Sequence, residues 1–186
     1  MKEYNIKELD DTLWNDLVIL FKTDSQCSDC WCMNHRLSPE KVVTGETAKK
    51  ELKLQIEQKM IYGLLAFDKN VCIGWCAVDP VTTQVGHDYV LESKSMSNSS
   101  WMIHCLYIHP NYRSKGISKL LISSAVDLAK KNGAKSLLSF PIPEENQNKF
   151  PKDEAEFSGR FSTYKKLGFE KKDRLSEFYE VMELNC

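Results

Sequence analysis

The fold of this chain is decided by residues 105–121, which read CLYIHPNYRSKGISKLL. The apolar start of this stretch indicates a buried strand, and Pro110 ends it. Beyond Gly116, apolar residues recur every three or four positions, which predicts an amphipathic helix from Gly116 to Asn132. The N-terminus of a helix presents unpaired N–H groups and a partial positive charge. The turn between strand and helix is therefore a candidate phosphate site.

The residues around this turn strengthen the interpretation. Gly116 has no side chain where the backbone must approach an anion closely. Arg113, Lys115 and Lys119 add positive charge at the same point. The pattern R-x-x-G-x-S alone also fits an ordinary strand-to-helix turn with a solvated basic loop. The sequence on both sides has to decide between the two interpretations.

The flanking segments predict a mixed sheet. A strand over 101–108, the helix and a strand over 135–140 form a strand–helix–strand unit, which favours a parallel pair. The apolar runs 61–67 and 71–78 enclose a turn of Asp, Lys and Asn and predict an antiparallel hairpin. We also expect a first strand over 4–9, helices over 10–22, 38–60 (interrupted at Gly45) and 155–167, a loop over 23–37, polar loops over 84–100 and 141–152, and two closing strands within 169–184. The fold class is α/β, a central mixed β-sheet flanked by helices, in a single domain over 1–186.

Composition excludes several classes of function. The chain has 186 residues, of which 42% are hydrophobic and 27% charged, with a formal net charge of −1. This size suits one domain, and the balanced charge gives no broad attraction to nucleic acid or to an anionic membrane. No apolar run approaches the roughly 20 residues of a membrane helix, and the polar N-terminus lacks the apolar core of a signal peptide. We expect a cytoplasmic protein with no nucleic-acid or membrane partner.

Three short motifs resemble the GNAT superfamily of N-acetyltransferases. LYIHP (residues 106–110) resembles the family's strand L-x-[VI]-x-P, and RSKGIS (residues 113–118) resembles its cofactor loop [RQ]-x-x-G-x-[GA]. Ser118 departs from the usual Gly or Ala but is small enough to leave the amides accessible. YKKLGF (residues 164–169) resembles the last motif of the family.

The resemblance implies an acetyl-CoA-dependent N-acetyltransferase with a GNAT-like fold and no metal cofactor. Acetyl-CoA would be the acyl donor, and the acceptor would be the primary amine of a small molecule or of a protein, attacking the thioester directly. The backbone of the strand would bind the pantetheine arm and the loop amides would bind the pyrophosphate. The protein would be a monomer or a homodimer. The cofactor-binding residues implied in this way are Leu106, Tyr107, Ile108, Arg113, Ser114, Lys115, Gly116, Ile117 and Ser118.

Amide formation also needs an acid and a base. An amine is an ammonium ion near pH 7, so one group must remove a proton and another must protonate the CoA thiolate. By resemblance to the family, Tyr164 is the general acid. The base stays open among four candidates, which are Asp79, Glu92, His104 and His109. Phe157 stands where the family often has an asparagine that contacts CoA.

The segment CSDCWCM (residues 27–33) resembles metal chemistry at first sight. Zinc sites usually have two separated ligand pairs, and neither a second Cys-x-x-Cys nor a His pair occurs here. We read the seven cysteines as free thiols, mostly buried, and expect no metal. A nucleophilic role for Cys76 or Cys105 is disfavoured because thiols in apolar surroundings have raised pKa values.

The end of this segment and two later segments resemble a bacterial GNAT subgroup. Its features are C-W-C-M followed by an arginine, a strand G-W-C-x-V-x-P, and a later strand led by tryptophan with an internal cysteine. They are matched here by residues 30–36, 74–80 and 101–105. If these parts meet over the sheet, they give the acceptor side an aromatic, apolar lining of Trp31, Met33, Trp75 and Tyr107. The alternative is that these four are ordinary core residues.

Two further functions remain open. One is a CoA-binding sensor or regulatory module that has kept the cofactor loop and lost turnover. The other is a metal-dependent interaction domain built on Cys27–Cys32. The presence of Tyr164 favours the enzyme over the sensor.

Overall fold

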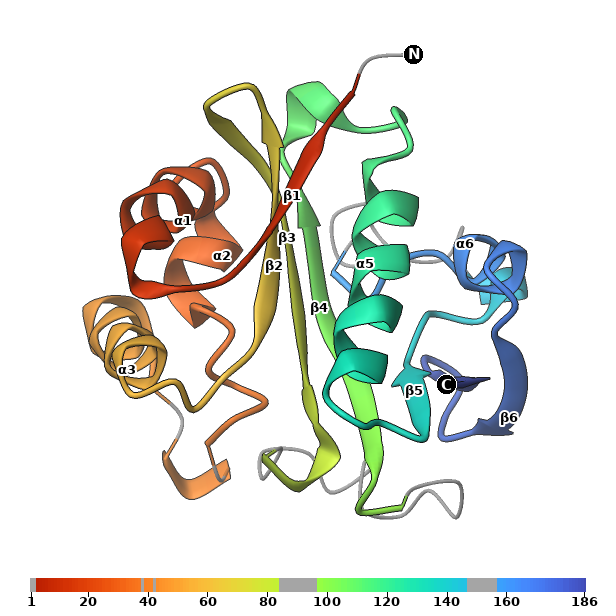
Figure 1. The fold of residues 1–186 in the computed structure, drawn as a ribbon. Helices are drawn as coiled ribbons and strands as arrows, with labels where there is room; N and C mark the ends of the chain where they lie inside the picture. Colours follow the sequence, from red (N-terminus) through yellow and green to blue (C-terminus); the bar gives the residue numbers. More distant parts are fainter. Residues whose placement is uncertain (1–2, 38, 42, 84–96, 147–156) are drawn as a thin grey trace.

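The computed structural model describes residues 3–37, 39–41, 43–83, 97–146 and 157–186. Its centre is a seven-stranded sheet with the order β1-β2-β3-β4-β5-β7-β6 (Figure 1). The strands are β1 (Asn5–Glu8), β2 (Gly63–Asp68), β3 (Val71–Pro80), β4 (Ser100–Ile108), β5 (Ser136–Ser139), β6 (Glu170–Arg174) and β7 (Glu180–Asn185). Only β4 and β5 pair in parallel, and the β2–β3 hairpin is antiparallel. The expected mixed α/β sheet is confirmed.

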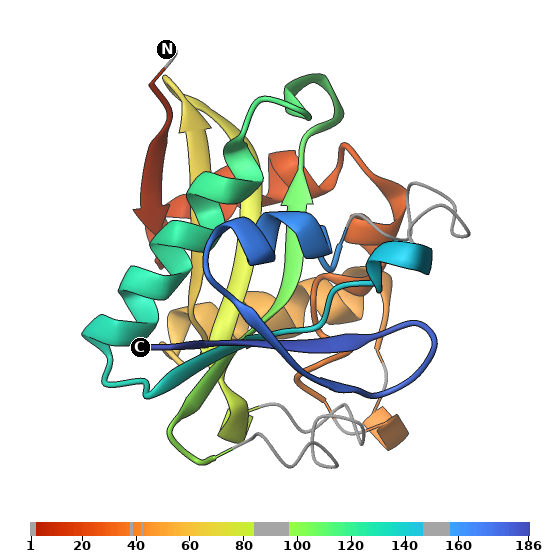
Figure 2. The same ribbon diagram turned by 90° about the vertical axis from the view of Figure 1, so that its right-hand side faces the viewer.

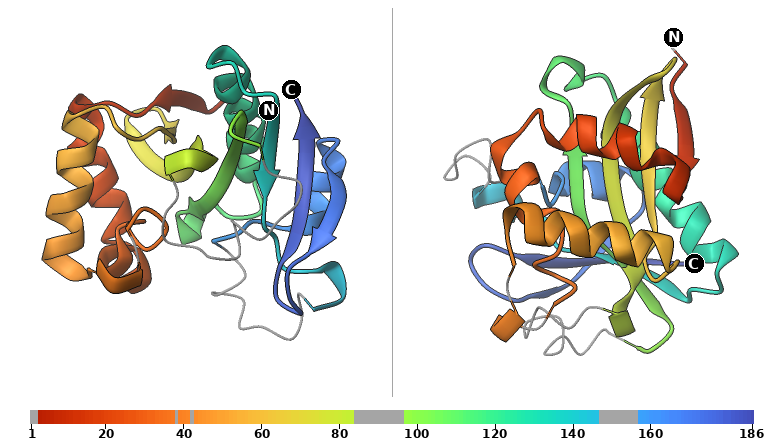
Figure 3. Two further views of the ribbon diagram at one scale, coloured as in Figure 1. Left: turned by 90° about the horizontal axis from the view of Figure 1, so that it is seen from below. Right: turned by 90° about the vertical axis from the view of Figure 1, so that its left-hand side faces the viewer.

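Helices cover both faces of the sheet. α1 (Trp14–Phe21), α2 (Ser25–Cys30) and α3 (Gly45–Glu57) lie on one face, and α5 (Ile117–Lys131) and α6 (Phe161–Lys166) lie on the other (Figure 3). Figure 2 shows α5 and α6 side by side. The 3-10 turns are η1 (Asp11–Leu13), η2 (Pro39–Lys41), η3 (Val81–Thr83), η4 (Pro110–Tyr112) and η5 (Glu144–Asn146). Within the described ranges, no helix combines the length and the apolar character needed to cross a membrane.

Two expectations about local structure were wrong. The cysteine segment, expected in a loop, contains α2, whose first turn is capped by the Asp24 carboxylate accepting from the amides of Gln26 and Cys27 at 2.9 and 3.2 Å. The last helix begins only at Phe161, because Gly159 adopts a left-handed φ of 74° just before it. The expected features at 84–96 and 147–156 lie outside the described residues.

β4 is the strand that positions the site. It pairs with β5 only through Ser100–Ile103 and then continues to Ile108, past the end of β5 (Figure 1). On its other side, Ala77 pairs with Cys105 and Val78 with Ile103, so His104 is the extra residue of a β-bulge. Within the described part of the chain, one edge of β4 therefore has no partner strand over residues 104–108.

The two faces of the sheet bury separate cores. The α5 face packs Leu106, Ile117 and Tyr164 in one cluster. The face covered by α1, α2 and α3 packs Trp31 and Trp75 in another, with the aromatic ring of Phe21 edge-on to Trp75. β4 contributes to both clusters, so its open edge lies at the junction of the two layers.

Candidate functional site

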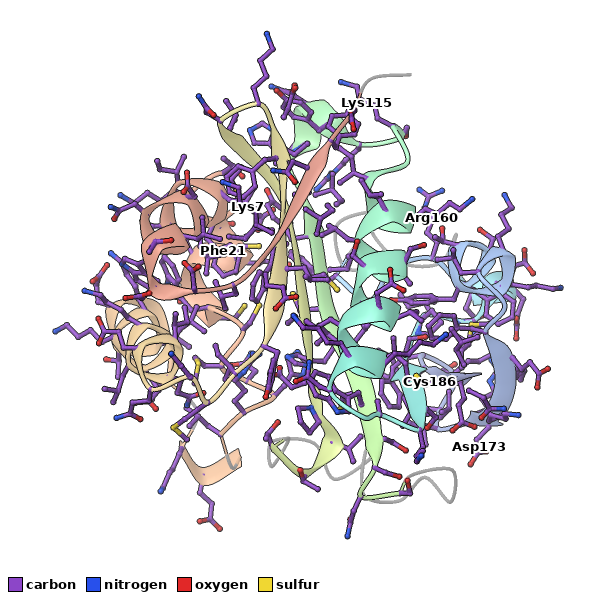
Figure 4. The ribbon with its side chains drawn as sticks, in the orientation of Figure 1. Lys7, Phe21, Lys115, Arg160, Asp173 and Cys186 are labelled. Atoms are coloured by element: carbon purple, nitrogen blue, oxygen red, sulfur yellow. The ribbon has the colours of Figure 1, made fainter. Side chains whose placement is uncertain are left out.

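Three hydrogen bonds between side chains and the backbone help to hold the turn between β4 and α5. Nδ1 of His109 accepts the amide of Asn111 at 3.2 Å, and Nε of Arg113 donates to the Ile108 carbonyl at 3.3 Å. Lys115 donates from Nζ to the Asn111 carbonyl at 2.7 Å and lies 4.9 Å from the centre of the Tyr112 ring. Arg113 and Lys115 therefore shape the turn as well as adding charge. Figure 4 shows Lys115 at this end of the molecule.

The backbone of the turn leaves a group of amides open. Ser114 and Gly116 both have left-handed φ values, 60° and 81°. Such alternation directs successive N–H groups towards one concavity. Among the described residues, the backbone N–H groups from Ser114 to Gly116 have no backbone acceptor, and the first bond into α5 runs from Leu120 to the Gly116 carbonyl. A Cβ added to Gly116 would meet no other atom within 4 Å beyond its chain neighbours, so the space beside this glycine is open. This arrangement suits a phosphate.

The open edge of β4 leads away from this turn. Backbone groups in an antiparallel ladder alternate between the two edges of a strand. The Leu106 amide points to the open edge, where it donates to the Phe157 carbonyl at 2.7 Å. By the same alternation Ile108 faces the open edge too, whereas the backbone of Tyr107 faces β3. The Tyr107 ring stacks on Phe157 at 5.9 Å between centroids, with 15° between the planes.

Tyr164 lies on α6, close to this edge but fully buried. Its hydroxyl donates to the Ser158 carbonyl at 3.1 Å, and burial raises its pKa well above the usual range. Gly159 makes room for it, since an added Cβ there would lie 3.0 Å from the tyrosine hydroxyl. Tyr164 is not among the described residues that line the two cavities of the next paragraph.

Two cavities adjoin the bulge in β4. Their volumes are about 120 and 330 Å³, and both are lined by His35, His104 and Phe157. The smaller is also lined by Ile103, Phe140, Ser158 and Tyr179. The larger is also lined by Gln26, Asp29, Cys30, Cys32, Asn34 and Cys105. The shared residues make this region the candidate acceptor side of the site.

A buried polar cluster lies behind His104. The Arg36 guanidinium donates to Oδ2 of Asp79 and, at 2.8 Å, to the Cys32 carbonyl. The Tyr62 amide donates to Oδ1 of Asp79 at 2.6 Å, and Nε2 of His104 lies 3.5 Å from Oδ2. Burial raises the pKa of the Asp79 carboxyl above its usual range, while Arg36 and the Tyr62 amide oppose the rise. The sequence offered Asp79 and His104 only as separate candidates for the base and did not link them to Arg36.

The other sequence-predicted residues are not among the described residues that line the two cavities. Trp31, Met33, Trp75 and Tyr107 are at most 2% exposed and are not among the described lining residues, so they are core residues and the proposed lining was wrong. His109 holds the β4–α5 turn. Glu92 lies outside the described residues.

Five of the seven thiols are buried, whereas Cys30 is partly exposed and Cys186 is exposed. The indole Nε1 of Trp75 donates to Sγ of Cys32 at 3.3 Å, and burial raises the pKa of Cys72 to about 12 and that of Cys76 well above its usual range. Within the described part of the chain, no group of three or more Cys, His, Asp or Glu residues is arranged to hold a metal ion.

Comparison with known proteins adds an independent finding. Residues 31–149 match the sequence model of the acetyltransferase (GNAT) family. A search of curated proteins gives no match.

Several solved structures share the fold. PaiA N-acetyltransferase from Thermoplasma acidophilum, in complex with coenzyme A, has 20% identity and a TM-score of 0.59, covering 99% of both chains. A GCN5-related N-acetyltransferase from Kribbella flavida has 13% identity and a TM-score of 0.61, covering 98% of both chains. YncA from Salmonella typhimurium, with its cofactor acetyl-CoA, has 12% identity and a TM-score of 0.58, covering 98% of this chain and 93% of its own. At these identities the similarity shows the fold alone.

Proposed function

This chain belongs to the acetyltransferase (GNAT) family, and from this premise we propose that it transfers an acetyl group from acetyl-CoA to a primary amine. The observation that carries the proposal is the group of open amides at Ser114–Gly116, which lies at one end of the open edge of β4. Coenzyme A and acetyl-CoA in the structures of two relatives of the same fold support it. When bound, acetyl-CoA supplies the thioester whose acetyl group is transferred.

The open amides and the open edge of β4 form the binding path that we propose for the cofactor. The amides of Ser114–Ser118 would hold the pyrophosphate, with Arg113 and Lys115 adding charge, and Ile117 placing the first turn of α5. The pantetheine arm would follow the open edge of β4, using the backbone of Ile108 and Leu106. The Leu106 amide would exchange the Phe157 carbonyl for the ligand. His104 lies four residues before Ile108 in the sequence, about 13 Å along the strand. There the path reaches the two cavities.

Tyr164 is our proposed general acid. Burial keeps its phenol protonated across neutral pH, so it carries the proton that a leaving thiolate needs, although the raised pKa also makes it a weaker acid. To act, its hydroxyl would exchange the Ser158 carbonyl for the sulfur. Its position at the open edge, next to Phe157–Gly159, supports this role.

Replacing Tyr164 with Phe is expected to lower kcat about a hundredfold, a typical contribution of general acid catalysis. The affinity for CoA should stay within about twofold, because the phenol makes no contact with the proposed phosphate site. Calorimetric titration with CoA and a free-thiol assay measure the two quantities. Tyr4→Phe is the matched control, since Tyr4 packs against the α5 core away from the site. An unchanged kcat in Tyr164→Phe would remove its role as acid.

The experiment that tests the function is a screen of primary amines, both small molecules and peptides, with release of the CoA thiol as the signal. We expect at least one amine to raise thiol release above the rate with acetyl-CoA alone, and mass spectrometry to find the acetylated amine. A protein that binds CoA but transfers acetyl to no amine would instead be a sensor. That second candidate has one observation in its favour, since the Leu106 amide and the Tyr164 hydroxyl are both bonded to the Phe157–Ser158 segment.

We also propose that the chain belongs to the subgroup with the C-W-C-M segment. Contacts between its motif segments support this assignment. Trp75 donates to Cys32, and Arg36 pairs with Asp79, so the first motif packs against the second as one unit. The packing explains why these residue types occur together in one sequence.

A further inference from the structure

Acetyl transfer to an amine requires a group that removes the proton of the ammonium form, whose pKa is about 10. We propose that His104 is this general base and that Asp79, itself fixed by Arg36, is its positioning residue. This inference rests on the acetyl transfer proposed above and assigns a role that the family match does not supply.

The first support is the place of His104 on β4. It is the extra residue of the bulge, opposite the junction of Ala77 and Val78. A bulge re-aims one side chain away from the regular alternation of a strand. The bulge lies at the residue where β4 loses β5 as a partner, so the re-aimed imidazole lies where the open edge begins.

The second support is proximity to the cavities. His104 lines both cavities, and the centre of its ring lies 4.9 Å from that of His35, which also lines both. The imidazole itself is 1% exposed and both of its nitrogens are buried, so the proposed reaction requires the ring to turn towards the cavity when the amine binds. Asp79 lines neither of them among the described residues, and His109 holds a turn at the far end of β4.

The third support is the carboxylate behind the ring. With Nε2 of His104 3.5 Å from Oδ2 of Asp79, the carboxylate favours the tautomer that carries its proton on Nε2. Nδ1 is then the nitrogen that accepts a proton. Arg36 and the Tyr62 amide hold the carboxylate in place, and the opposite charges of Arg36 and Asp79 cancel.

Charged and titratable groups from several segments lie around His104. Among the described residues these are Asp79 on β3, Arg36 and His35 after α2, and the neighbouring thiols Cys32 and Cys105. The thiols are buried and neutral, because their pKa values are raised. Asp79 favours the imidazolium form of His104, and Arg36 opposes it.

The proton and electron transfers balance as follows. Nδ1 of His104 takes a proton from the acceptor ammonium, and the freed lone pair forms the N–C bond with the acetyl carbonyl carbon. The adduct still carries one N–H proton more than the amide product, and this proton passes to water. The C–S bond then breaks, and Tyr164 gives its proton to the sulfur. The products are the N-acetylated amine and the CoA thiol. His104 then passes its proton to water, and Tyr164 regains one from water.

The test is the pH dependence of kcat/KM for His104→Gln, since Gln keeps a donor towards Asp79 and loses the base. We expect wild type to rise to a plateau above about pH 7, as imidazole loses its proton near pH 6.5. The variant should be about a hundredfold slower at pH 7 and should rise about tenfold per pH unit towards the pKa of the amine. The two profiles converge at high pH, where the amine is neutral without help. A structural defect alone would lower the profile equally at every pH and would overturn the proposal.

Two comparison variants sharpen the test. His35→Gln changes the same cavity walls and is expected to change KM for the amine while keeping the plateau of kcat/KM above about pH 7. If His35→Gln loses this plateau and His104→Gln keeps it, the proposal is overturned. Asp79→Asn removes the charge that favours imidazolium, so the plateau should begin at lower pH; an unmoved profile would remove the positioning role. If His104→Gln does not fold, His104→Asn is measured in the same way. If the wild-type protein binds CoA but acetylates no amine, the proposed acetyl transfer is refuted. If the wild-type protein is active and His104→Gln has the same pH profile, only the role of His104 as base is refuted.

Discussion

Gly116→Asp is expected to abolish measurable CoA binding. The new carboxylate would occupy the open space beside Gly116, at the turn where the proposal puts the pyrophosphate. Two unit charges about 4 Å apart near a protein surface repel by about 4 kcal/mol, which corresponds to roughly a thousandfold loss of affinity. Titration calorimetry with CoA measures the loss.

The matched control is Gly116→Asn. Asn and Asp have the same shape, and both tolerate the left-handed φ of 81° better than other side chains do. Both variants therefore share the cost to the fold and should have similar melting temperatures. The control is expected to lose about tenfold in affinity through bulk alone. Equal affinities for the Asn and Asp variants would mean that no phosphate lies at this turn.

The parts of the fold that the sequence predicts well are contiguous and periodic. The helix expected over 116–132 is observed as α5, Ile117–Lys131, because its apolar stripe and the glycine at each end leave little choice of boundaries. The hairpin of β2 and β3 is equally local. α2 was missed because six residues are too short to establish a helical period, and only its Asp24 cap signals it.

The candidate site also has a local part, which the sequence predicts, and a non-local part, which it does not. The phosphate turn is one unbroken segment, so a short motif specifies it. The cluster behind His104 joins three segments, with Arg36 and Asp79 separated by 43 positions in the sequence, and depends on a bulge that no residue pattern marks. The contact between Phe157 and Leu106 is also non-local. Sequence reasoning therefore found the cofactor end of the site and left the acceptor end open.

Arg36→Met is expected to lower the free energy of unfolding by about 3–5 kcal/mol, because it leaves the Asp79 carboxylate buried without its cation. Both side chains are at most 2% exposed, so water cannot replace the missing charge. In a chain of this size the loss corresponds to a fall in melting temperature of roughly 10 °C or more. Urea unfolding and calorimetry measure it.

The pH dependence separates this charge effect from lost packing. Burial already raises the pKa of Asp79, and removing Arg36 removes the largest force that lowers it. A carboxyl whose pKa is higher in the folded than in the unfolded chain destabilises the fold increasingly as pH rises towards the folded pKa. The stability gap between wild type and Arg36→Met should therefore be larger at pH 8 than at pH 5. A gap independent of pH would assign the loss to packing of the arginine stem.

The double variant Arg36→Met/Asp79→Asn tests the same cause from the other side. Asn keeps an oxygen for the Tyr62 amide and carries no charge, so it should recover more than half of the lost stability. A buried ion pair is often replaceable by neutral groups at little cost in stability. If the double variant folds stably yet loses the pH plateau of kcat/KM, the pair serves to hold His104 rather than to hold the fold. Full activity with an intact plateau would instead make Arg36 and Asp79 structural residues only.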